Sequence, residues 1–171
     1  PDDLPIFTLC EWTREAILGL QTSSMHYYQR PDATHVEVDP LATSLSGWGG
    51  RVSFAKQGGN TLGLISLGAL SPGFDPNDIG FQYSGSDVIN FQIIPGYLWT
   101  KPGPVFQQVM LGIGAFTNHD FGGNNVSKGA ILFSEGLFRN FWRFNLTGLA
   151  TPATLSNRLT RGGPLALIPR G

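Results

Sequence analysis

In the central part of the chain, residues 74 to 99, turn sequences at 75–78 and 84–87 precede two segments whose side chains alternate with a period of two. From residue 88 onward, one parity carries apolar and aromatic side chains, and the other carries mainly small or amide side chains. A period of two is that of a β-strand with two different faces. We therefore expect a strand that separates an apolar phase from a polar one. Its apolar stripe is predicted to consist of Ile89, Phe91, Ile93, Tyr97 and Trp99.

The same alternation recurs between turn sequences that are rich in glycine, proline and asparagine. Consecutive strands joined by such short turns form antiparallel hairpins. The sequence therefore predicts an all-β fold, in which an antiparallel meander of about seven to eight strands forms a β-barrel or a strongly curved sheet. The predicted strand segments are residues 22–29, 44–57, 61–71, 79–83, 88–99, 105–118, 127–138 and 141–150.

One short helix is predicted near residues 13–20, where Thr13 can cap a segment with an apolar side. We expect residues 1–20 to form an irregular or short helical lead-in to the sheet. The sheet is expected over residues 21–151, and an arginine-containing tail over residues 152–171. The 171 residues are predicted to form a single domain.

The length of the predicted strands indicates a membrane-type sheet. Several of them contain 10 to 14 residues. Strands of globular proteins usually have about five or six residues, whereas a membrane-crossing strand has about 9 to 11. No apolar run approaches the roughly 18 residues that a membrane helix needs. Contact with a membrane is therefore expected to involve strands.

The composition agrees with an all-β protein of low charge. Charged residues make up 13% of the chain, compared with about 25% in an ordinary soluble domain. The chain has 23 glycines and 12% aromatic residues, which is typical of transmembrane barrels but also of soluble β-sandwiches. The net charge of −1 gives no indication of electrostatic capture of nucleic acid, and no nucleic-acid partner is expected. The single cysteine, Cys10, cannot form an internal disulfide.

Candidate chemistry is sparse along the chain. His119 and Asp120 adjoin in a glycine-rich loop, where a histidine beside a carboxylate could transfer protons or bind a metal. A third partner is missing at a useful spacing, because His26 and His35 lie far away in the sequence. We therefore predict no enzymatic activity and no catalytic, cofactor-binding or metal-binding residue. Replacing His119 and Asp120 together by alanine is expected to leave the fold unchanged.

The aromatic residues suggest an interface. Trp48, Trp99 and Trp142 lie near predicted strand ends, where interfacial aromatic girdles occur in membrane barrels. Girdle formation or apolar packing is favoured over stacking on sugar rings. The predicted membrane or partner contacts are Trp48, Ile89, Phe91, Ile93, Tyr97, Trp99, Trp142 and Phe144.

Four stretches of the chain resemble one protein family. They are AILGLQTSSMHYYQRPD at 16–32, DPLATSLSGWGGRVSFAK at 39–56, SPGFDPNDIGFQ at 71–82 and LTRGGPLALIPR at 159–170. In this order they resemble an uncharacterised bacterial family whose members combine an N-terminal domain like carbohydrate-binding module family 9 with a C-terminal outer-membrane-type β-barrel. The resemblance lies in the barrel region. It implies that the chain is part of a barrel wall, and it carries over no catalytic residue.

We therefore expect a non-enzymatic structural protein that forms part of an outer-membrane β-barrel with a role related to transport. One alternative is an accessory β subunit that docks on a larger membrane protein complex and stabilises it. A second alternative is a soluble carbohydrate-binding β-sandwich. The expected partners are membrane lipid or other subunits of a membrane complex, with carbohydrate as a further candidate. The expected location is the bacterial cell envelope, in the outer membrane or on its periplasmic side.

Overall fold

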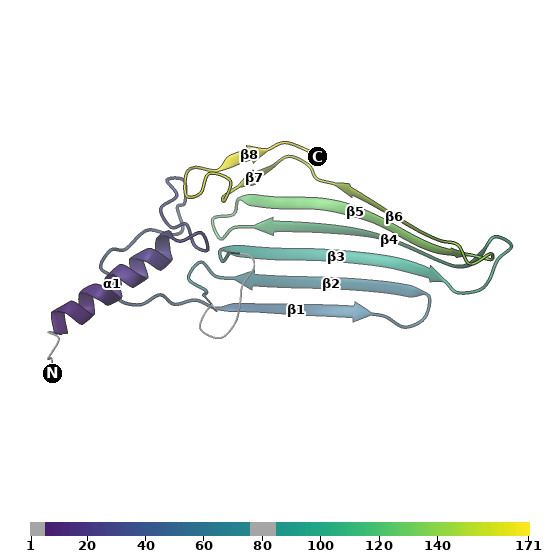
Figure 1. The fold of residues 1–171 in the computed structure, drawn as a ribbon, viewed down its shortest axis with the longest axis horizontal. Coiled ribbons are helices and arrows are strands. Elements are labelled where there is room, and N and C mark those ends of the chain that lie inside the picture. Colours follow the sequence, from purple (N-terminus) through teal and green to yellow (C-terminus); the bar gives the residue numbers. More distant parts are fainter. Residues whose placement is uncertain (1–5, 76–84) are drawn as a thin grey trace.

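The computed structural model describes residues 6–75 and 85–171, and the side chains from residue 13 onward. In this part of the chain, one helix precedes eight strands (Figure 1). They are α1 Ile6–Thr22, β1 Gly49–Lys56, β2 Thr61–Leu70, β3 Val88–Trp99, β4 Phe106–His119, β5 Asn125–Phe138, β6 Arg143–Ala150, β7 Thr154–Ser156 and β8 Ala166–Ile168.

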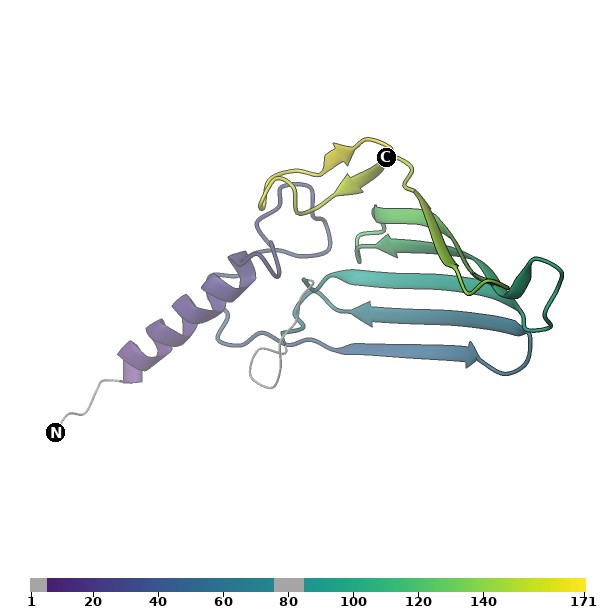
Figure 2. The same cartoon turned by 45° about the vertical axis from the view of Figure 1, so that its right-hand side comes forward.

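Strands β1 to β6 form one antiparallel sheet in which each strand pairs with its neighbours in sequence. The short strands β7 and β8 form a separate two-stranded sheet. The six-stranded sheet is a curved wall, and β7 and β8 lie next to it near the start of β5 (Figures 1 and 2). Helix α1 lies beyond one end of the wall and packs against none of the strands. Neither face of the sheet is therefore covered by the helix.

The predicted fold class is confirmed. The chain is an antiparallel meander, and of the two forms expected from the sequence the structure shows the curved sheet, with β1 and β6 as separate edges, and not a closed barrel. The segments predicted at 44–57, 61–71, 88–99, 105–118, 127–138 and 141–150 correspond to β1 to β6. The segment predicted at 79–83 lies outside the described residues.

The strand predicted at residues 22–29 was wrong, because this segment forms turns after α1. The backbone nitrogens of His26 and Tyr27 both donate to the carbonyl oxygen of Ser23. The Ser23 hydroxyl also accepts a hydrogen bond from the Met25 backbone. Serine competes in this way with regular structure by bonding to nearby backbone groups. Tyr27 has a φ of 50°, which no strand contains.

The ends of the chain also differ from the prediction. Helix α1 is 17 residues long, so it starts well before the predicted residue 13. The tail, for which no strand was predicted, contributes β7 and β8. Each of these strands has three residues, which is too short to show a readable alternation in the sequence.

The described part of the chain has no buried apolar core. All of its fully buried large side chains are polar or charged. A sheet normally buries one face against a second layer of structure. Here a single layer leaves its apolar residues at the surface, so the stability of the isolated wall rests on its hydrogen-bonded ladders and on polar contacts. In the same part of the chain, no helix is both long enough and apolar enough to cross a membrane.

Candidate functional site

One face of the six-stranded sheet is apolar. Residues opposite each other in an antiparallel ladder point to the same face. The register aligns Val52 with Leu67 and Leu67 with Phe91, and the next row aligns Phe54, Ile65 and Ile93 in the same way. We call this surface the apolar face, and its exposed large residues are Val52, Phe54, Ile65, Leu67, Phe91, Ile93, Tyr97, Trp99, Leu111, Ile113, Leu132 and Leu146.

The apolar face is nearly free of charge. Among the strand residues that the ladders place on it, the charged ones are Lys56 and Lys128, and none is acidic. Its large side chains remain exposed even in the central strands, where Phe91 is 40% and Ile113 is 56% accessible. Contiguous apolar surfaces of this kind occur at contacts with membranes or other proteins and at ligand-binding grooves.

Aromatic side chains gather at both ends of the wall. At the end with the β3–β4 and β5–β6 turns, the Tyr97 and Trp99 rings lie 4.6 Å apart, and Phe106, Phe138 and Phe144 form a second cluster with centroids 4.6 to 6.0 Å apart. At the opposite end, Trp48 meets Phe121 edge to face at 5.9 Å. The rows between these ends carry mainly aliphatic side chains.

The residues predicted as membrane or partner contacts are placed as follows. Ile89, Phe91, Ile93, Tyr97 and Trp99 all lie on the apolar face, as the alternation in the sequence predicted. Phe144 shares this face and is half-buried by its aromatic neighbours. Trp48 and Trp142 are exposed at opposite ends of the wall.

The two edges of the sheet have no partner among the described strands. β1 pairs with β2 alone, and β6 pairs with β5 alone. Every residue of β1 is solvent-exposed. An edge strand presents a row of unpaired backbone N–H and C=O groups that can pair with a further strand.

The opposite face of the sheet is polar near α1. One cross-strand row consists of Arg51, Gly68, Asn90, Asn118 and Ser127, from β1 to β5. Arg51 Nη2 donates to Asn90 Oδ1 at 3.2 Å, and Asn90 Nδ2 donates to Asn118 Oδ1 at 2.6 Å. Gly68 leaves room for the arginine, since a Cβ at Gly68 would lie 3.2 Å from Arg51 Nε. We call these five residues the polar row.

The same face becomes more apolar toward the β1–β2 turn. Leu62, Ile94 and Phe133 are half-buried there. Phe133 fills the space above Gly112, since a Cβ at this glycine would overlap the phenyl ring. The sheet therefore has one predominantly apolar face and one face that is polar over only part of its length.

Four charged or titratable side chains meet at the end of the wall near α1. Arg30 Nη2 lies 2.8 Å from Asp87 Oδ2, and Arg30 Nη1 lies 3.8 Å from Asp120 Oδ2. His35 Nε2 lies 2.9 Å from Asp87 Oδ2. Arg30, Asp87 and Asp120 are each at most 4% exposed. We call Arg30, His35, Asp87 and Asp120 the buried clamp.

Backbone groups complete the buried clamp. Asp87 Oδ1 accepts a hydrogen bond from the Phe121 N–H at 3.0 Å, and Asp120 Oδ1 accepts one from the Asn124 N–H at 2.8 Å. Asp87 has a φ of 62°, a left-handed conformation that aspartate adopts more readily than most residues. The clamp therefore joins the loop after α1, the start of β3 and the β4–β5 turn.

The clamp fits a charge-paired structural site better than a metal site. His35, Asp87 and Asp120 place potential ligand atoms within 4.8 Å of one another. The Arg30 guanidinium lies 2.8 Å from Asp87 and 3.8 Å from Asp120, so a cation would compete with it for both carboxylates. The sequence had offered no third partner for Asp120, and this was wrong, because the fold brings the distant His35 to it.

His119 and Asp120 do not act as a pair. His119 Nε2 lies 3.1 Å from Thr117 Oγ1 and 3.2 Å from Asn125 Nδ2. The Asp120 carboxylate instead faces Arg30 and Asn124. The two side chains point apart because consecutive residues of an extended strand end face opposite sides. Asp120 is 1% exposed, so it has a structural role that sequence reasoning missed.

A second buried histidine lies in the turns after α1. His26 is 3% exposed, and its Nδ1 lies 3.2 Å from Ser23 Oγ. Burial lowers the pKa of His26, an effect opposed by the charge of Asp75. The imidazole is therefore held in its neutral form more strongly than a histidine in water.

Comparison of the chain with family models, with curated proteins and with solved structures finds no match.

Proposed function

We propose that this chain is a non-enzymatic structural protein that forms part of the wall of an outer-membrane-type β-barrel. The observation that carries the proposal is the apolar face, which is continuous over all six strands and free of acidic side chains. Complete removal of a side chain of this size from water stabilises the protein by roughly 1.5 to 3 kcal/mol. A surface with twelve partly exposed members therefore favours an apolar phase by on the order of 10 kcal/mol.

Two further features favour lipid as that phase. Aromatic side chains at both ends of the wall with aliphatic side chains between them follow the arrangement of a membrane barrel, in which aromatic girdles flank an apolar band. Strands β2 to β5 have 10 to 14 residues, which is enough to cross the hydrocarbon region of a bilayer.

The free edges of β1 and β6 define what else the wall needs. Within a bilayer, unpaired backbone groups cost several kcal/mol each, so spanning sheets are closed. We infer that further strands pair with β1 and β6 and complete the barrel. This proposal agrees with the resemblance to the bacterial barrel family and with a location in the outer membrane, both of which stay predictions.

An accessory β subunit is the second candidate, because a protein partner could cover the same apolar face. The open edges favour this candidate as well, since a neighbouring subunit could pair with them. The carbohydrate-binding sandwich has less support. A sandwich packs two sheets face to face, and the described part of the chain has one large sheet.

Replacing Phe91 and Ile93 together by aspartate tests the proposal. Both residues lie on the apolar face of the central strand β3, so two buried charges in lipid are expected to abolish insertion. The matched control is Gln92→Asp, which changes the residue between them on the opposite face. Both variants and the unchanged chain are mixed with phospholipid vesicles and separated by flotation.

The proposal expects the unchanged chain and Gln92→Asp to float with the vesicles and the double variant to remain in the aqueous fraction. If the double variant stays folded in water and loses only companion proteins, the accessory subunit is correct. A wild-type chain that is monomeric and soluble without detergent at high concentration would rule out both readings.

A further inference from the structure

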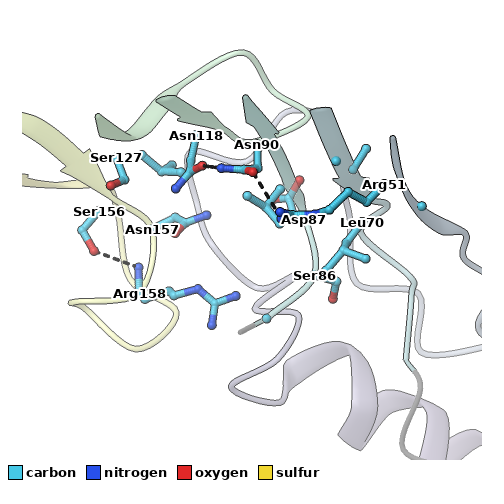
Figure 3. Close-up of a pocket in the computed structure, with 16 residues that line it drawn as sticks. Arg51, Leu70, Ser86, Asp87, Asn90, Asn118, Ser127, Ser156, Asn157 and Arg158 are labelled. Atoms are coloured by element: carbon cyan, nitrogen blue, oxygen red, sulfur yellow. Dashed lines mark hydrogen bonds between the residues drawn. The ribbon is translucent and has the colours of Figure 1, made fainter. Parts of the chain in front are cut away.

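The face of the wall opposite to the apolar face contains a pocket of about 650 Å³, whose lining includes polar and charged side chains (Figure 3). The polar row of the sheet lines one side of it, and residues 156–158 of the tail line the other. Its volume lies in the range of small-molecule sites, which is about 300 to 1,000 Å³. The pocket lies on the face opposite to the apolar face, so it remains available whichever partner covers that face.

Two arginines reach into this pocket from opposite sides. Arg51 extends from β1 and Arg158 from the loop after β7, each toward the centre of the pocket (Figure 3). Among the described residues, no carboxylate lies within ion-pair distance of either guanidinium. Arginine stays protonated under all conditions in which the protein is folded. Neither guanidinium is therefore ion-paired with a described carboxylate.

The acidic residue that lines the pocket, Asp87, is hydrogen-bonded within the buried clamp. Its two carboxylate oxygens bond to Arg30 Nη2, His35 Nε2 and the Phe121 N–H. The carboxylate is thereby turned toward the buried clamp. Counting Arg30, Arg51 and Arg158 as positive and Asp87 and Asp120 as negative, the pocket and the clamp together carry one excess positive charge.

Amides and hydroxyls supply the remaining contacts. Asn90 and Asn118 hold Arg51 in place on the sheet. On the tail side, Asn157 is 9% exposed, and Ser156 Oγ fixes the start of the loop by accepting from the Arg158 and Leu159 backbone. Partial burial lowers the pKa of Arg158, although the residue keeps an exposed surface that a ligand can reach.

We propose that this pocket binds a small solute through an oxyanion, a phosphate or a carboxylate, held between Arg51 and Arg158. Guanidinium groups recognise such oxyanions with short charge-assisted hydrogen bonds. The amides of the polar row and of Asn157 are placed to bond to the neutral part of the same solute. This inference goes beyond the structural role proposed above and does not depend on what covers the apolar face.

Inorganic phosphate is the probe for the test. The full chain is titrated with phosphate in a non-ionic detergent, and binding is followed by isothermal titration calorimetry. We expect a dissociation constant on the order of 1 mM, which weakens as the ionic strength rises. Loss of one charged hydrogen-bonding group weakens binding by about tenfold or more, so Arg51→Gln and Arg158→Gln are each expected to do so.

The matched control is Arg143→Gln, because Arg143 lies in β6, outside the pocket, next to Glu135. It is expected to change phosphate binding less than twofold. Gly85→Ala provides an independent variant, since a Cβ at Gly85 would overlap the Arg158 guanidinium and push this flexible side chain out of the pocket. We expect Gly85→Ala to weaken phosphate as Arg158→Gln does, with unchanged circular dichroism.

Three results would overturn the inference. The first is an unchanged chain that shows no heat of binding at phosphate concentrations of about 50 mM, far above the expected dissociation constant. The second is binding that Arg51→Gln and Arg158→Gln leave intact. The third is tighter binding of the neutral disaccharide maltose than of phosphate, which would assign the pocket to carbohydrate. None of these results bears on flotation with vesicles, so the two proposals can fail separately.

Discussion

Removing Arg30 is the sharpest test of what holds the loop after α1 to the sheet. Arg30→Met keeps the length and apolar stem of the side chain but removes its charge. Arg30 contacts Asp87 at 2.8 Å and Asp120 at 3.8 Å, and all three residues are buried. The variant leaves two buried carboxylates without the cation that neutralises them.

The expected cost follows from these distances. Breaking a buried ion pair by removing one partner costs about 3 to 5 kcal/mol, because the other charge stays buried and uncompensated. Asp87 and Asp120 also repel each other once the guanidinium is gone. The two carboxylates have oxygen atoms within 4.8 Å of each other, so at an effective dielectric constant of about 20 this repulsion alone amounts to at least about 3 kcal/mol. We expect Arg30→Met to lower the free energy of unfolding by about 3 to 5 kcal/mol.

The assay is urea unfolding of the detergent-solubilised chain, followed by tryptophan fluorescence. Arg143→Met is the matched control, because the Arg143 contact with Glu135 spans 3.6 Å between side chains that are 69% and 41% exposed. Such a surface pair contributes at most about 1 kcal/mol. Adding Asp87→Asn to Arg30→Met removes one of the uncompensated charges and is expected to recover about 1 to 2 kcal/mol. A loss below about 1 kcal/mol for Arg30→Met, equal to that of the control, would refute the reasoning.

Two further predictions concern single side chains. Asp120→Ala is expected to lower the free energy of unfolding by about 2 to 4 kcal/mol, because it leaves the Asn124 N–H and part of Arg30 unpaired. His119→Ala, at the adjacent and more accessible position, is expected to change the free energy of unfolding by less than about 1 kcal/mol. Urea unfolding compares the two variants, and equal effects would contradict the structural role of Asp120. Because the pKa of His26 is lowered in the folded state, the unfolded chain binds a proton at this histidine at a higher pH than the folded chain does. The contribution of neutral His26 to stability is therefore complete above pH 6.5 and is lost as the pH falls from 6.5 toward the lower pKa of the folded state. Unfolding measured from pH 7.5 to 5 is therefore expected to show a weaker pH dependence for His26→Gln than for the unchanged chain, and parallel curves would contradict the burial of a neutral imidazole.

The sequence by itself determined the strands and their two faces. The alternation of Ile89, Phe91 and Ile93 with Asn90 and Gln92 is a local property of an extended chain, because successive side chains point to opposite sides. Most turns between successive strands are short, and short turns can join only antiparallel neighbours, so the strands form an antiparallel meander. The apolar face was therefore readable without any knowledge of tertiary contacts.

The sequence was misleading where local hydrogen bonds compete with a weak pattern. Residues 22–29 alternate faintly, but Ser23 bonds to the following backbone and turns the chain instead. The same limit applies to the three-residue strands β7 and β8, which exist because each pairs with the other.

Only the tertiary structure decided the clamp and the pocket. The partners in the clamp lie 57 residues apart for Arg30 and Asp87, and 52 apart for His35 and Asp87, so no spacing motif could reveal them. Arg51 reaches Asn90 across an intervening strand because the register places Gly68 between them. Strand register and the closing of long loops fix which polar groups meet, and both are properties of the whole chain. Local alternation specifies which face is apolar, whereas the fold alone specifies which charges are neutralised and which remain free to bind.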